Sequence, residues 1–214
     1  MSVDQQAIFE LVRTYKSQST PTIVVGDQVM IGSRSPEKLT DWAHENGANT
    51  GTFEETARFG ELLAIATLGT ATEEALKLAG SKNFDGKVLI DATNPLHFEP
   101  GRPPSLAIGG NDSLGEHVQR TVPSARVVKA FNTVGNAHFV DPQFPGGPPD
   151  MFICGNDASA KETVAGICTT FGWPQPIDLG GIESARYLEA LAMVWILTYF
   201  ATRSGNHAFK LLRK

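Results

Sequence analysis

The segment from Val29 to Lys38 contains residue types suited to holding an anion. A short apolar run ends in Gly32-Ser33-Arg34, and Ser35 followed by Pro36 is typical of the N-cap and first residue of a helix. A hydroxyl, a guanidinium and a helix N-terminus would then converge, with Lys38 one turn further on. This combination suits a dianionic phosphate, although an ordinary surface turn with solvated charges would carry the same residues.

From residue 60 onward, short apolar runs alternate with helix-favouring segments. We expect strands at residues 62–66, 87–92, 125–130, 151–154 and 175–179. Strands that are apolar throughout, with helices between them, are typical of a parallel sheet covered on both faces. Such sheets bind ligands at the carboxyl ends of their strands, which here carry Thr67, Asn94-Pro95 and Asn132-Thr133.

The position of Arg34 favours one kind of dinucleotide. In a dinucleotide-binding sheet, the adenosine ribose is recognised at the end of the second strand. An acidic residue there selects the 2′-hydroxyl of NAD, whereas an arginine selects the 2′-phosphate of NADP. Arg34 follows an early apolar strand in this way, so if the segment binds a dinucleotide rather than forming a surface turn, its residues favour NADP over NAD.

Over about residues 28–198, the chain resembles the NADPH-dependent reductases of the deazaflavin coenzyme F420. The matching segments are residues 29–38, 91–96, 128–133, 151–157 and 188–193. The resemblance implies an NADP-binding Rossmann domain, a small helical C-terminal part, and hydride transfer between the nicotinamide and a small-molecule redox co-substrate, coenzyme F420 or another. Because the two cofactors carry the hydride chemistry, no side chain is expected to be a catalytic acid or base.

The same resemblance implies which residues bind the cofactor. Contacts to the 2′-phosphate fall on Ser33, Arg34 and Lys38. The loops beside the cofactor and near the nicotinamide carry the other six residues, which are Thr67, Leu68, Asn94, Pro95, Ala130 and Asn132.

The first 32 residues depart from that family. A glycine-rich G-x-G-x-x-G loop, whose amides would hold the pyrophosphate, is absent, and Gly26 is the only glycine before Val29. Residues 4–16 have the apolar spacing of an amphipathic helix, and residues 19–32 resemble the C-terminal half of a glutaredoxin-like or thioredoxin-like protein. The chain therefore resembles a chimera, natural or engineered, in which NADP binding is weakened or lost.

Two apolar runs in this N-terminal part, residues 23–25 and 29–31, are separated by little more than Gly26-Asp27. Parallel strands need a crossover of about a dozen residues, whereas so short a link makes an antiparallel hairpin. We expect residues 22–25 to fill the place of the missing first strand, between residues 29–31 and 62–66, in a sheet that is otherwise parallel. The helix at residues 4–16 would cover the exposed face.

These observations predict an α/β fold. It would be a Rossmann-like, doubly wound, mostly parallel sheet with an antiparallel N-terminal hairpin strand and a small C-terminal helical part. Residues 1–180 would form the dinucleotide-binding domain, with residues 1–32 atypical, and residues 181–214 the helical segment, as one long helix or two. The run from Leu188 to Phe200 is apolar all round, which, with the resemblance, favours burial in a homodimer.

Composition limits the class of protein. The 214 residues carry a formal charge of -5, which gives no electrostatic footprint for nucleic acid or a membrane surface. The longest apolar run, residues 190–201, is about half the length of a membrane span, and the N-terminus lacks the features of a signal peptide. A cytoplasmic location fits, with Cys154 and Cys168 expected to be buried as small hydrophobic residues.

Other chemistries have little support in the sequence. The five histidines lack metal-ligand spacing, so no metal is expected, and there is no G-x-S-x-G motif for a nucleophilic serine. His97 could face a substrate or be solvated, and Arg186 and Glu189 could pair on the last helix or line a cleft. The alternatives to an NADP(H)-dependent oxidoreductase are a chain of this fold with weak or no cofactor binding and no catalysis, and a thiol oxidoreductase, which would lack its C-x-x-C.

Overall fold

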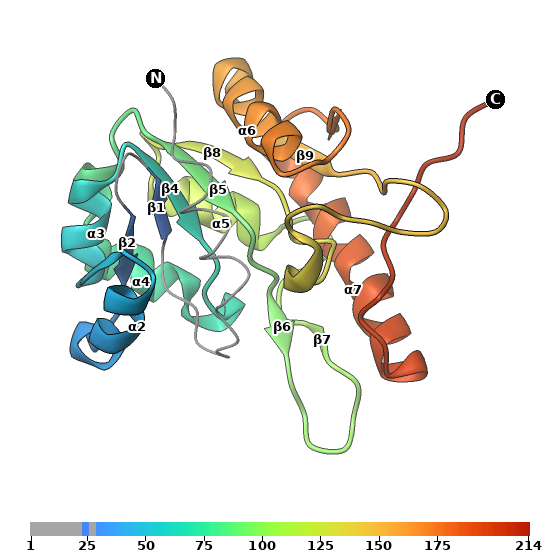
Figure 1. Cartoon of the computed structure of the whole chain (residues 1–214), viewed down its shortest axis with the longest axis horizontal. Helices are drawn as coiled ribbons and strands as arrows, with labels where there is room; N and C mark the ends of the chain where they lie inside the picture. Colours follow the sequence, from blue (N-terminus) through green and yellow to red (C-terminus); the bar gives the residue numbers. More distant parts are fainter. Residues whose placement is uncertain (1–22, 26–28) are drawn as a thin grey trace.

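The structure is a computed structural model that describes residues 23–25 and 29–214, and its centre is an eight-stranded sheet (Figure 1). The strand order is β10-β9-β8-β5-β4-β1-β2-β3. In chain order, these strands are β1 (Ile23–Val25), β2 (Met30–Gly32), β3 (Asn49–Gly51), β4 (Leu62–Ile65), β5 (Val88–Asp91), β8 (Arg126–Lys129), β9 (Phe152–Gly155) and β10 (Ile177–Asp178). A separate two-stranded hairpin, β6 (Leu96–His97) and β7 (Ser105–Leu106), projects from the sheet beyond β5.

Strand β1 lies inside the sheet and is antiparallel to both of its neighbours. Ile23 is opposite Ile31 of β2 on one side and Ala64 of β4 on the other. The expected hairpin and the expected position of its first strand are therefore confirmed. Without β1, both β2 and β4 would present unpaired backbone groups in the middle of the sheet, which is costly.

The sheet is mostly parallel, but β1 is not its only reversed strand. Strands β2, β3, β4, β5 and β8 share one direction, while β9 is antiparallel to β8, and β10 is parallel to β9. The prediction that all strands except the inserted one are parallel is wrong for these two. Between β8 and β9, residues 130–151 contain only the short 3-10 turn η4 (Asn136–His138), so no crossover helix returns the chain to the starting edge.

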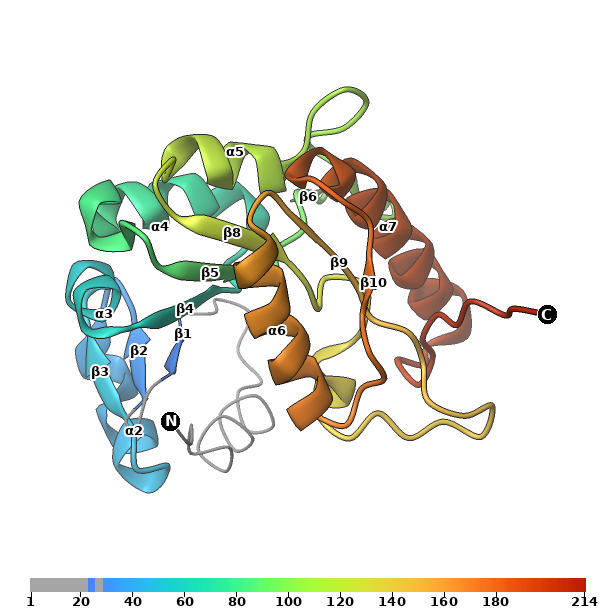
Figure 2. The ribbon, with the colours of Figure 1, turned by 90° about the horizontal axis from the view of Figure 1, so that it is seen from above.

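Helices cover both faces of the sheet (Figure 2). One face carries α3 (Phe53–Phe59), α4 (Thr72–Ala79) and α5 (Leu114–Thr121), and the other carries α6 (Ala158–Thr170). The 3-10 turn η1 (Pro36–Leu39) and α2 (Thr40–Glu45) pack beside β2 and β3, and the C-terminal α7 (Ala185–Thr202) contacts α5 and β7 at the other end. The doubly wound, Rossmann-like arrangement is thus confirmed.

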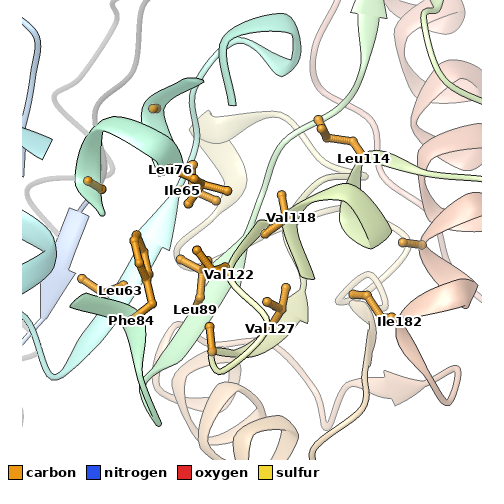
Figure 3. Packing of buried hydrophobic residues seen from close by; sticks show 14 of the residues in the cluster. Leu63, Ile65, Leu76, Phe84, Leu89, Leu114, Val118, Val122, Val127 and Ile182 are labelled. Atoms are coloured by element: carbon orange, nitrogen blue, oxygen red, sulfur yellow. The ribbon is translucent and has the colours of Figure 1, made fainter. Parts of the chain in front are cut away.

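Alternate residues of the strands enter two separate cores, which explains why the strands read as apolar throughout. Leu62, Ala64 and Ile90 belong to the cluster under α6. Most residues of the larger cluster come from β4, β5 and β8 and from α4 and α5 with their flanking turns, as Figure 3 shows for Leu63, Ile65, Leu89, Val127, Leu76, Phe84, Val118 and Val122. The others come from α3, β9 and the start of the C-terminal helical part.

The C-terminal helix is shorter than expected. Helix α7 ends at Thr202, where Arg203 adopts the left-handed conformation (φ 55°), and residues 204–214 form no regular secondary structure. The prediction of helix as far as Lys214 is therefore wrong. The following segment is tied back to the body of the protein, because the Trp195 indole donates to the His207 carbonyl (2.8 Å) and the Leu211 amide to the Asp150 carboxylate (2.6 Å).

The contact between α5 and α7 requires a glycine. A Cβ at Gly115 would lie 2.7 Å from the Ala185 Cβ, so Gly115→Ala should destabilise the protein by about 1–3 kcal/mol. Gly166→Ala on α6 is the control, because nothing lies within 4 Å of its Cβ position, and better helix propensity should leave stability equal or up to about 1 kcal/mol higher. Urea unfolding measures both, and equal stability of the two variants would contradict the packing argument.

Candidate functional site

The carboxyl ends of β2, β4, β5 and β8 meet at one edge of the sheet, because these strands share a direction. This edge brings together the segments that contain the nine predicted cofactor residues. Ser33 and Arg34 follow β2, Thr67 and Leu68 follow β4, Asn94 and Pro95 follow β5, and Ala130 and Asn132 follow β8, with Lys38 in η1. At about 4.8 Å per strand, the edge spans about 19 Å from β2 to β8.

The β2 end of this edge presents a hydroxyl and two free cations. The Ser33 amide donates to the Gly51 carbonyl (2.9 Å), which fixes the turn against β3. Arg34 and Lys38 are exposed, and within the described part of the chain neither side chain has an ion-pair partner. Both are therefore available to a phosphate.

The helix start predicted at Ser35 differs in detail. The Ser35 side chain makes no capping bond, and its own amide instead donates to the Ser33 hydroxyl (3.1 Å). The Lys38 amide donates to the Ser35 carbonyl three residues earlier (3.1 Å), so the segment is a 3-10 turn rather than the first turn of an α-helix.

The neighbouring helix α3 has an N-terminus that is already capped. The Thr52 hydroxyl accepts from the Glu55 amide (3.2 Å), and the Glu55 carboxylate accepts from the Thr52 amide (2.7 Å) and hydroxyl (2.9 Å). These bonds from Thr52 lower the pKa of Glu55. The cap leaves Glu55 engaged with Thr52, so the N-terminus of α3 already has a carboxylate on its cap amide and does not need a ligand there.

At the β8 end, Asn94 and Asn132 hold each other. The Asn94 Nδ2 donates to the Asn132 carbonyl (2.8 Å), and the Asn132 Nδ2 donates to the Asn94 Oδ1 (3.0 Å) and to the Leu188 carbonyl of α7 (3.1 Å). Asn132 is only 6% exposed, and its Oδ1 has no hydrogen-bond partner among the described residues. Because the Asn132 Nδ2 donates to two oxygens, its Oδ1 is an acceptor left over for an N–H or O–H donor.

A strained residue sets the direction of this loop. Phe131 has a φ of 63°, which is unusual for a bulky side chain and costs about 1–3 kcal/mol. Its amide donates to the Met151 sulfur (3.3 Å), and its ring packs on Phe139 and Phe171. Strain of this kind persists only where the surroundings impose it, and here it turns the chain just before Asn132.

The loop after β4 approaches Asn94 through a glycine that the sequence did not single out as a site residue. A Cβ at Gly69 would lie 2.1 Å from the Asn94 carbonyl oxygen, so only glycine fits there. Beside it, the Thr67 and Thr72 hydroxyls share a hydrogen bond (2.9 Å), while the Leu68 side chain is exposed. The loops after β4 and β5 therefore form one packed unit.

Three charged side chains are buried beneath these loops. The Lys129 ammonium donates to the Asp91 carboxylate (2.8 Å) and pairs with the Glu189 carboxylate (2.9 Å), and the side chains of these residues are at most 1% exposed. Glu189 also accepts from the Leu114 and Gly115 amides at the start of α5 (3.0 Å each). Burial alone would lower the pKa of Lys129, but Asp91 and Glu189 hold it above its usual value.

The sequence did not reveal this charged cluster (Asp91, Lys129 and Glu189). Each residue is a charge inside an apolar strand or helix, which was the available signal. The prediction that Arg186 and Glu189 pair or line a cleft is wrong, because the Arg186 Nε donates to the Glu116 carboxylate (2.8 Å) and Glu189 is buried with Lys129.

Other sequence candidates have ordinary surroundings. His97 is exposed on β6 near Glu99 (3.5 Å). Cys154 and Cys168 are buried as expected, and burial raises the pKa of each thiol to about 12. Among the described residues, no three His, Cys, Asp or Glu side chains are grouped so as to hold a metal, and no helix is long and apolar enough to cross a membrane.

Comparisons with known proteins identify the family. The family described as NADP oxidoreductase, coenzyme F420-dependent, matches residues 17–95. A solved structure of a candidate F420-dependent NADP reductase from Arthrobacter sp. FB24 is 40% identical, with a TM-score of 0.82 over 86% of this chain and 88% of that chain. The chain belongs to the coenzyme F420-dependent NADP oxidoreductase family. It is also 26% identical, over 79% of its length and 81% of the relative's, to the F420-dependent NADP reductase of Methanocaldococcus jannaschii.

Membership in the coenzyme F420-dependent family places the chain among NADP-dependent oxidoreductases. The fold is shared more widely, since a reductive aminase from Aspergillus terreus in complex with NADPH has a TM-score of 0.56 at 17% identity. The family match begins at residue 17, so it includes all of residues 19–32, the segment for which the sequence predicted a glutaredoxin-like origin. Half of that segment (residues 19–22 and 26–28) and the amphipathic pattern at residues 4–16 lie outside the described residues.

Removing the cation of the charged cluster would leave Asp91 and Glu189 buried without a counter-charge. Lys129→Met should therefore destabilise the protein by about 3–5 kcal/mol. The matched control is Lys161→Met, which breaks the partly exposed pair with Asp178 (2.7 Å) and should cost about 1 kcal/mol, because the half-exposed Asp178 carboxylate remains in contact with water. Denaturant unfolding compares the two, and a similar small loss in both variants would show that the buried pairing is unimportant for stability.

Proposed function

We propose that the protein is an NADP(H)-dependent oxidoreductase that transfers hydride between the nicotinamide and a deazaflavin, coenzyme F420, or another small redox co-substrate. The observation that carries this proposal is the unpartnered Oδ1 of Asn132, buried at the opposite end of the edge from the free cations Arg34 and Lys38. An acceptor at one end and a phosphate-binding group at the other fit the two ends of NADP.

Each group at the edge has a role in this proposal. Ser33, Arg34 and Lys38 hold the 2′-phosphate, while Thr67, Leu68, Asn94, Pro95 and Ala130 border the cofactor. Asn132 accepts a hydrogen bond from the carboxamide or from a ribose hydroxyl. The bound nicotinamide supplies the hydride chemistry, and the protein positions it and excludes water, so no side chain needs to transfer a proton.

We also propose that the middle of the site binds the cofactor more weakly than its ends do. Only residues 26–29 connect β1 to β2, and the two strands are antiparallel. So short a connection leaves no room for a helix whose first amides would hold the pyrophosphate. This supports a second candidate, a chain of the same fold that binds NADP weakly or not at all and does not catalyse.

A homodimer is part of the proposal. Tyr187, Val194 and Leu197 lie on one side of α7 and are 73%, 52% and 45% exposed, and residues 190–202 contain no charge. We further propose domains at residues 1–180 and 181–214 and a cytoplasmic location.

The proposed dimer can be tested by sedimentation velocity. The wild type should be a dimer, and Val194→Glu should weaken it, because the change would place a charge in the interface. A wild-type monomer at all concentrations would contradict the dimer.

Arg34→Ala tests the 2′-phosphate assignment. Loss of a charge-assisted hydrogen bond should weaken NADPH binding by about ten- to a hundredfold and leave NADH binding unchanged, as measured by calorimetry. Arg58→Ala is the control, because Arg58 is paired with Glu54 on the exposed side of α3. Equal affinity of the wild type for NADH and NADPH would refute the assignment.

The wild-type titration also separates the two candidate functions. Without amides for the pyrophosphate, affinity should be in the range of about 10 μM or weaker. Saturation with NADPH followed by oxidation in the presence of coenzyme F420 would support the enzyme, whereas no detectable NADPH binding would favour the second candidate.

A further inference from the structure

We propose that the charged cluster of Asp91, Lys129 and Glu189 positions the Asn94–Asn132 pair and so fixes the nicotinamide end of the site. This inference deepens the proposed function and rests on it for the identity of the ligand. The three residues would be positioning residues, since their side chains are at most 1% exposed and so do not contact a ligand themselves.

One ammonium group connects the two loops that carry the asparagines. The Lys129 Nζ donates to the Asp91 carboxylate and to the Thr93 carbonyl, each at 2.8 Å. Thr93 directly precedes Asn94, and Lys129 lies three residues before Asn132. A shift of the ammonium would therefore move one loop relative to the other.

Asp91 also fixes the first loop from within. Its Oδ1 accepts from both the Thr93 amide (2.9 Å) and the Thr93 hydroxyl (2.6 Å). Thr93 thus has its backbone amide, its hydroxyl and its carbonyl all bound within the cluster. Such complete satisfaction of a buried polar network leaves the loop a single arrangement.

Glu189 brings α7 into the same arrangement. Its carboxylate pairs with Lys129 (2.9 Å) and accepts from the first two amides of α5 (3.0 Å each). The preceding residue, Leu188, supplies the carbonyl that accepts from the Asn132 Nδ2 (3.1 Å). The two oxygens that accept from the Asn132 Nδ2 therefore belong to Asn94 and Leu188, the chain neighbours of Thr93 and Glu189, which the cluster holds.

Stability alone does not account for these charges. A buried ion pair can often be replaced by apolar residues of similar volume without loss of stability, because desolvation offsets the attraction. The hydrogen bonds of Lys129 are directional and have a fixed length, so they set the distance between the loops that carry Asn94 and Asn132. Apolar contacts would not fix this distance. The strained Phe131 between Lys129 and Asn132 needs such an imposed geometry.

The test compares Glu189→Gln with Glu116→Gln. Both changes neutralise a carboxylate at the contact of α5 with α7, but Glu116 is bound to Arg186 and does not adjoin the asparagine loops. Hydrogen exchange of the ligand-free proteins is followed in peptides covering residues 92–96, 130–134 and 33–39. Titrations with NADPH and with 2′,5′-ADP, which lacks the nicotinamide half, are followed by calorimetry.

Glu189→Gln should speed exchange at residues 92–96 and 130–134 but not at residues 33–39. It should weaken NADPH about tenfold relative to 2′,5′-ADP, a ratio that general loss of stability would not change. Glu116→Gln should change neither readout. Unchanged exchange in the asparagine loops, or equal weakening of both ligands, would overturn the inference.

Two further outcomes are separable. If the wild type binds neither NADPH nor 2′,5′-ADP, the proposed function fails, while the exchange data still decide whether the cluster holds the loops. If Glu189→Gln does not fold, Glu189→Asp takes its place, because it keeps the charge but shortens the reach to Lys129 and α5. Loop exchange equal to that of the wild type in Glu189→Asp would then overturn the inference.

Discussion

The pairing of Lys129 with Asp91 and Glu189 is the interaction on which the rest of the structure depends. A charge buried without a partner is costly, so β5, β8, α5 and α7 must keep the spacing that closes these bonds. The same spacing brings Gly115 against Ala185, where a larger residue would not fit. The helical C-terminal part is thereby joined to the sheet through a charged network as well as through apolar packing, and the join lies directly beneath the site.

A second constraint is continuity of the sheet between β2 and β4. The three residues of β1 supply hydrogen-bond partners for the backbone groups of β2 and β4 on either side. An antiparallel strand does this as well as a parallel one. We propose that the reversed direction matters for ligand binding, because a hairpin link cannot contain a helix that presents amides to a pyrophosphate. Reversing the direction of β1 therefore leaves the sheet intact, whereas it would affect the cofactor binding that we propose.

The sequence predicted features that depend on local chemistry. Apolar runs located the strands, the brief link at Gly26-Asp27 determined the direction of β1, and the direction of β4, β5 and β8 located the edge of the site. Features that depend on distant partners escaped prediction. Lys129 meets Asp91 across 38 residues of sequence, the direction of β9 follows from a connection with no helix, and the α7 terminus depends on a backbone conformation at Arg203.

In the proposed site, the residues that set the affinity for a dinucleotide and those that set the preference for NADP over NAD lie at different places along the edge. Selectivity is a difference between two binding free energies, so it survives the loss of any interaction that both ligands share. The pyrophosphate is common to NAD and NADP, and weak binding there lowers both affinities equally. In the proposed binding mode, the 2′-phosphate that distinguishes NADP from NAD lies beside Arg34, and the nicotinamide lies beside Asn132. The proposed weak binding in the middle of the site would therefore lower the affinity for both dinucleotides and leave the preference for NADP unchanged.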